Sequence, residues 1–166
     1  MTVPDALEKY VILSVEKSLR DGSLGSQVIE PGGGESAESS DEDWVEVFSL
    51  AMPREANRSA IWAGSYLFQV NCFSRTANVR ADSDRARPWE LAGKVRALLM
   101  PADGTGIMVA QHGVDSSVTY SCLSIIEIEE SYLGEGAAGI SGQQGVPSGP
   151  SNLHAVALTC RGYMVA

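Results

Sequence analysis

The long, largely apolar run from Ala60 to Arg75 constrains the fold more than any other segment. It reads AIWAGSYLFQVNCFSR and alternates well enough to form one strand. Strands in globular domains average about five or six residues, whereas this one would reach roughly 50 Å at about 3.3 Å per residue. Both sets of alternate side chains are largely apolar, which is typical of a strand covered on two faces. A single small core cannot cover that length, so we expect another protein chain to bury part of it.

Length and charge set the outer bounds. A chain of 166 residues with 44% hydrophobic residues can bury a core, and we expect one globular domain over residues 1–166. The net charge of −9, from 21 acidic and 12 basic residues, argues against general binding to phosphate backbones. No window is apolar enough for a membrane span and no leader pattern opens the chain, so we expect a soluble protein with no membrane partner.

Hydrophobic periodicity predicts two helices. The first lies within Thr2 to Arg20 and ends at Asp21-Gly22, where glycine can take the left-handed conformation. The second runs from Pro88 to Met100, where the apolar residues Leu91, Val95, Leu98 and Leu99 recur at helical spacing. Alternation predicts five strands, at Trp44–Met52, Ala60–Arg75, Ile107–Gln111, Asp115–Glu130 and Leu153–Val165.

Two segments are expected to be flexible loops, at about residues 22–43 and 134–151. The second is rich in Gly, Ser and Pro. The first has low hydrophobicity and clustered negative charge, which favours a mobile loop. It is either a solvated linker or an acidic surface that a partner or a pore uses, and its acidic candidates are Glu35, Glu38, Asp41, Glu42 and Asp43.

This order of elements favours an α+β fold. We expect a mainly antiparallel β-sheet with two α-helices packed on one face. The two pairs of strands joined by long loops would project as long hairpins, and their edges would be left for another subunit.

Catalytic chemistry finds little support in the sequence. The two histidines, His112 and His154, lie in no nucleophile motif. The cysteines Cys72, Cys122 and Cys160 are odd in number and widely spaced, which is typical of buried free thiols. The acidic run at residues 127–130 alternates as a solvent-facing strand does. We therefore predict no catalytic, cofactor-binding or metal-binding residues, and no cofactor.

A group of arginines follows the long strand, interleaved with Asp82 and Asp84. The residues form either a salt-bridged polar loop or a contact between subunits, because guanidinium groups make bidentate pairs across interfaces. With two aromatic residues of the strand, they make up the candidate interface: Arg75, Arg80, Arg85, Arg87, Trp62 and Tyr66.

The pattern resembles the tail terminator (tail completion) proteins of long-tailed bacteriophages. The resemblance is carried by the first helix PDALEKYVILSVEKSLR, by YLFQVNCFSRTA leading through a polar loop into WELAGKVRALL, and by the closing strand HAVALTCRGYMVA. It implies a structural virion protein rather than an enzyme: a homo-oligomeric ring of six subunits at the head-proximal end of the tail, assembled in the host cytoplasm. Such a ring caps the tail tube protein, stops its polymerisation, joins the head-closure or connector protein, and lets DNA pass without specific binding.

Two other classes stay open. One is a different neck or tail subunit, such as a tail tube protein or a head-closure adaptor. The other is a small cytoplasmic ligand-binding module or enzyme, which would be favoured if His112, Cys122 and His154 converged in one pocket.

Overall fold

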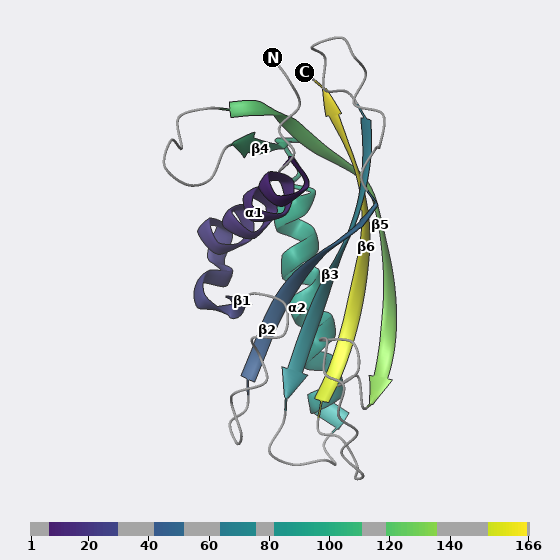
Figure 1. Cartoon of the computed structure of the whole chain (residues 1–166). Coiled ribbons are helices and arrows are strands. Elements are labelled where there is room, and N and C mark those ends of the chain that lie inside the picture. The colour runs from purple at the N-terminus through teal and green to yellow at the C-terminus, as the bar shows by residue number, and fades with distance from the viewer. Residues whose placement is uncertain are drawn as a thin grey trace.

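The computed structural model describes residues 7–29, 42–51, 64–75, 82–110, 119–135 and 153–165 (Figure 1). Within these ranges the chain forms an α+β fold, as the sequence predicts. Its helices and strands are α1 (Leu7–Leu19), β1 (Val28–Ile29), β2 (Glu42–Ala51), β3 (Gly64–Arg75), α2 (Asp82–Leu99), β4 (Ile107–Ala110), β5 (Thr119–Glu135) and β6 (Leu153–Val165).

The strands form one six-stranded sheet in the order β1-β2-β3-β6-β5-β4. Strand β1 runs parallel to β2, and every other neighbouring pair is antiparallel. The pairs β2–β3 and β5–β6 are the expected antiparallel neighbours. Their connections lie outside the described residues, so projecting hairpins are not confirmed.

Both helices lie on one face of this sheet, which we call the helix face (Figure 1). Helix α1 packs against β4 and β2, whereas α2 crosses β3 and β6. The apolar residues repeat at helical spacing, so each helix turns one stripe into the core. That stripe consists of Val11, Val15 and Leu19 in α1 and of Leu91, Val95 and Leu99 in α2, all at most 3% exposed. Burying one such side chain contributes about 1.5–3 kcal/mol.

Strand β3 is covered on two faces along part of its length, as its composition predicts. Five consecutive residues, Val70 to Ser74, are buried. On the helix face they join the main core. On the opposite face, which we call the open face, Phe73 packs with Trp44 and Ala155 in a second cluster, against partly buried Ile29 and Leu133. For these five residues the chain itself supplies the burial that we expected from another chain.

The end of the first helix differs from its prediction. The chain continues from α1 through a π-helical segment, Arg20–Leu24, and a 3-10 turn, Gly25–Gln27, into β1. Gly22 does not end the helix; it lets the chain approach the Leu98 side chain of α2 closely. Leu24 and Val28 are buried and hold the segment on the core. The predicted loop is therefore wrong at residues 22–29 and 42–43, and residues 30–41 lie outside the described ranges.

Helix α2 begins at Asp82, six residues before its predicted start. Pro88 lies inside the helix, where it lacks the N–H that would bond one turn back. The residues on either side of it contact the sheet: Arg87 pairs with Asp43, and Trp89 stacks on Tyr132. Strand β5 likewise runs to Glu135, into the segment predicted to be a loop. Within the described residues, neither helix has the length and hydropathy needed to cross a membrane.

Candidate functional site

The structure brings two candidate interface arginines beside one candidate acidic residue. At the end of the sheet where β2 begins, Arg87 Nη2 lies 2.9 Å from Asp43 Oδ1. The same oxygen accepts a hydrogen bond of 2.6 Å from Ser74 Oγ. The Arg75 guanidinium lies 5.3 Å from the centre of the Trp44 ring. Arg87 and Ser74 therefore contact Asp43, and Arg75 contacts Trp44, all within one chain. The partner of Arg87 is Asp43 of β2, whereas the sequence suggested Asp82 and Asp84 as partners of the arginines.

The other candidate residues have different places. Tyr66 is 3% exposed in the core, and burial raises the pKa of its hydroxyl above the ordinary value. Arg85 lies in α2 and Glu42 at the start of β2. The remaining candidates, Arg80, Trp62, Glu35, Glu38 and Asp41, lie outside the described residues.

A row of polar residues crosses three strands under the first half of α2. Asp43 lies opposite Ser74, and Ser74 lies opposite His154. The row holds the residue types of a Ser-His-Asp triad, but Ser74 is fully buried and donates to Asp43. His154 Nδ1 lies 3.0 Å from Tyr132 Oη instead. Because a triad needs the histidine between the carboxylate and an accessible serine, this row is structural.

Sequence reasoning missed a buried carboxylate on the open face. Glu46 is fully buried, and its Oε1 accepts a hydrogen bond of 2.9 Å from Trp44 Nε1. Burial of a charge is costly unless hydrogen bonds offset it. No signal in the sequence marks this residue, because a glutamate between Val45 and Val47 reads as the solvent-facing position of a half-buried strand.

The residues that would favour an active site do not converge. Cys122 is paired with Val165 at one end of β6, whereas His154 lies at the other end, opposite Glu135. His112 lies outside the described residues. Cys72 and Cys160 are buried free thiols, as predicted, and Cys122 is a partly buried free thiol. Among the described side chains, no group of three or more His, Cys, Asp or Glu could hold a metal ion.

Large apolar side chains are exposed together where β4, β5 and β6 meet. Tyr163 is 40% exposed, Ile126 56% and Met108 59%. Tyr163 lies opposite Ser124, and Met108 lies opposite Cys122, two residues before Ser124 on the same strand face. Ile126 is the extra residue of a β-bulge just beyond. We call these three residues the apolar patch. Exposed apolar clusters of this kind are typical of protein interaction sites.

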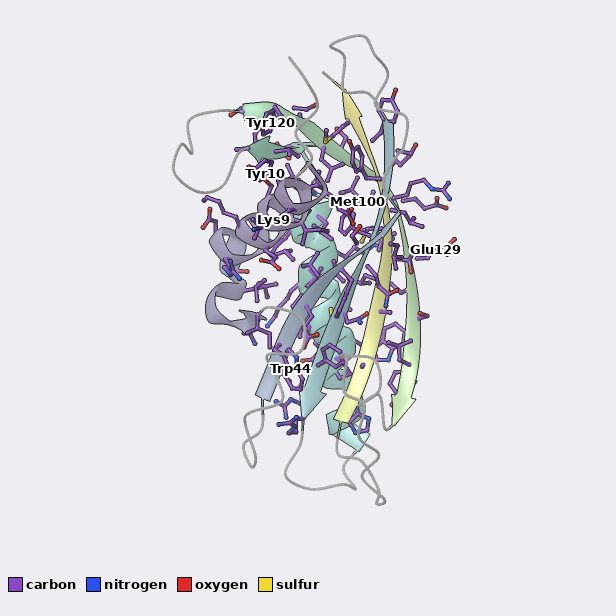
Figure 2. All side chains as sticks on the ribbon, in the orientation of Figure 1. Lys9, Tyr10, Trp44, Met100, Tyr120 and Glu129 are labelled. Atoms are coloured by element: carbon purple, nitrogen blue, oxygen red, sulfur yellow. The ribbon has the colours of Figure 1, made fainter. Side chains whose placement is uncertain are left out.

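Strand β5 also has a long edge that β4 does not cover. Strand β4 pairs only with Thr119 to Leu123, whereas β5 stays paired with β6 as far as Glu135. No described strand lies on the outer side of Ser124 to Glu135, which we call the β5 edge. Figure 2 shows Glu129 of this edge pointing away from the sheet, on the side opposite the helices.

The comparisons with known proteins add no functional information. No family model and no curated protein matches the sequence. Among solved structures, one chain whose name describes no function is similar, with a TM-score of 0.46 and 16% sequence identity over 95% of this chain and 94% of that chain. A likeness at this level supports no inference about function.

Proposed function

We propose that this protein is a tail terminator, the subunit of a ring that caps the tail tube of a long-tailed bacteriophage. In this role it stops polymerisation of the tube and joins the tube to the head connector. The proposal combines the sequence resemblance with one observation of the structure: the apolar patch on β4, β5 and β6.

The apolar patch supports contact with another chain. Tyr163, Ile126 and Met108 lie on three successive strands, β6, β5 and β4, and Arg161, Glu127 and Glu129 are exposed on the same two strands as Tyr163 and Ile126. Interfaces commonly have such an arrangement, in which aromatic residues and methionine form a core within a polar rim. A contact that joins this patch to a different surface of the next copy is heterologous, and heterologous contacts form a ring when the rotation between successive copies closes.

The dimensions of the strands agree with this proposal. Strand β5 has 17 residues and β6 has 13, whereas α2 has 18. At about 3.3 Å per strand residue and 1.5 Å per helical residue, β5 reaches roughly 55 Å and α2 roughly 27 Å. Strand β5 is therefore about twice as long as α2, and β4 pairs only with its first residues, so β5 offers strand surface to a neighbouring subunit.

The charge of the chain suits a DNA passage. With a net charge of −9, the protein repels phosphate backbones. Glu127 and Glu129 carry negative charge on the open face. A ring of such subunits lets DNA slide through without binding it.

Mass measurement and negative-stain imaging test the proposal. We expect the purified chain to form closed rings, and these rings to cap the ends of separately prepared tail tubes. Long filaments would instead support a tail tube protein. A particle that stays monomeric at high concentration, with no ring on tail tubes, would refute the terminator.

A further inference from the structure

The β5 edge has the features of a strand-addition site. Between its two β-bulges, at Ile125/Glu127 and Tyr132/Gly134, residues Glu127 to Tyr132 form a regular segment. Its inner side pairs with residues 156–161 of β6. All but Ile128 of these six residues are exposed. Backbone N–H and C=O groups on the outer side of such a segment bond water until another strand replaces it.

Helix α2 packs over β3 and β6, and two of its side chains reach the helix-face side of this edge. Arg96 Nη1 lies 2.6 Å from Glu130 Oε1. About two turns earlier, Trp89 stacks on Tyr132 with 6.4 Å between ring centres, and both residues are 41% exposed. An extended segment added to β5 would therefore place alternate side chains against an exposed aromatic pair held by α2.

The open-face side of the edge is acidic. Glu127 and Glu129 are two residues apart, so both project from this face. Arg161 Nη1 lies 3.1 Å from Glu127 Oε2, in a pair that is about half exposed and screened by water. The other alternate side chains of an added segment would face these carboxylates.

We propose that the β5 edge binds an extended basic segment of another protein as an added strand. Its apolar residues face Trp89 and Tyr132, and its Lys or Arg residues face Glu127 and Glu129. Main-chain hydrogen bonds supply affinity and the alternate side chains supply specificity, as in other cases of β-strand addition. The same glutamates disfavour pairing of this edge with the β5 edge of a second copy, because like charges would face each other across the strands.

This site can be tested separately from ring formation. Its pairing segment, Glu127 to Tyr132, contains none of the three residues of the apolar patch, although Glu127 and Glu129 also border that patch. A chain that stays monomeric and still binds the segment would refute the ring and keep the site.

A blocked peptide of alternating lysine and valine is the probe. Its matched control is the same peptide with N-methyl groups on alternate backbone nitrogens, which keeps charge and side chains but removes strand hydrogen bonds. We expect the full-length protein to bind the unmodified peptide at least about tenfold more tightly than the control. Amide hydrogen exchange should slow at residues 127–132.

Two charge variants complete the test. Glu129→Lys should weaken binding of the unmodified peptide by about tenfold. Glu8→Lys makes the same charge change at an exposed position of α1 and should leave binding unchanged. Urea unfolding checks that both variants are folded. Equal binding of the two peptides, equal effects of the two variants, or unchanged exchange at residues 127–132 would each overturn the proposal.

Discussion

At the scale of single residues, two glycines are predicted to respond to alanine in opposite ways. Gly106 precedes β4, and a Cβ there would lie 2.9 Å from the carbonyl oxygen of Leu123 and against Cys122 Sγ. The backbone oxygen cannot move aside without shifting β5. We expect Gly106→Ala to lower the free energy of unfolding by about 1–3 kcal/mol, measured by urea denaturation. An unchanged urea midpoint would contradict the close contact between Gly106 and β5.

Gly93 provides the matched case. It lies in the exposed part of α2, and nothing lies within 4 Å of a Cβ built there. Alanine removes conformational freedom from the unfolded chain and improves helix propensity. We expect Gly93→Ala to raise the free energy of unfolding by about 0.5–1 kcal/mol in the same assay. A loss of stability would contradict an open helical surface at this position.

The buried thiols predict how stability depends on pH. Burial raises the pKa of Cys160 to about 12. Burial, then Cys160 and then Glu130 raise the pKa of Cys72. The unfolded thiol has a pKa near 9.0, so between pH 9 and 12 the unfolded chain binds fewer protons than the folded chain. The stabilising contribution of each thiol is therefore complete below pH 9 and is lost as pH rises.

Urea unfolding at pH 8, 9 and 10 measures this loss. Above pH 9 we expect each thiol to contribute a fall of about 1 kcal/mol per pH unit. Cys160→Ala should remove the contribution of one thiol, so the free energy of unfolding should fall less steeply with pH. The contributions of ionisable groups that both proteins share cancel when the two slopes are subtracted. Identical slopes in the two proteins would mean that Cys160 ionises normally in the fold.

At the scale of elements, a partly buried ion pair anchors α2 to the sheet. The Arg87–Asp43 pair is about one quarter exposed on each side, and Ser74 also bonds Asp43. Arg87→Met should lower the free energy of unfolding by about 1–2 kcal/mol, because Asp43 loses a partner in a partly buried site. Amide exchange should accelerate in the first turns of α2.

Lys17→Met is the control for that prediction. The Lys17–Asp21 pair of α1 is 63% exposed on both sides. Exposed pairs contribute about 0–1 kcal/mol, so this variant should change stability little. Equal effects of the two variants would show that the Arg87 contact does not anchor α2.

Most elements follow from periodicity, and the exceptions have physical causes. Strand β6 has the predicted bounds, Leu153–Val165, because its apolar residues alternate without a break. The start of α2 was missed because the residues before Pro88 are polar and carry no apolar periodicity, although Arg87 contacts the sheet there. Strand β1 was missed because two residues carry no periodicity.

At the scale of the whole molecule, the sequence indicates residue types that suit an interface. It does not predict which of those residues are exposed. The two-faced strand β3 pointed to burial by another chain, yet Phe73 finds Trp44 and Ala155 within the same chain. The exposed apolar residues lie on β4, β5 and β6 instead. Tyr163 alternates with buried Gly162 and Met164, so the sequence pattern places it on the opposite face of β6. Whether that face is exposed or covered depends on which residues the neighbouring strands place beside it.

The apolar patch gives the last prediction, on self-association. Tyr163 forms its β6 side, between Ser65 and Ser124 on the neighbouring strands. If assembly of the subunits buries the Tyr163 side chain, Tyr163→Ser should raise the dissociation constant of the assembly by about 10–100-fold. Loss of one buried aromatic side chain costs about 1.5–3 kcal/mol. Sedimentation equilibrium over a range of concentrations measures that constant.

Leu50→Ser is the matched control for this variant. Leu50 is 47% exposed on β2, which lies toward the opposite edge of the sheet from the strands of the apolar patch. It should leave the dissociation constant unchanged, and urea unfolding should show both variants folded. If Leu50→Ser instead disrupts the assembly while Tyr163→Ser does not, the subunits meet through the β2 side of the sheet, and the patch on β4, β5 and β6 faces a different partner.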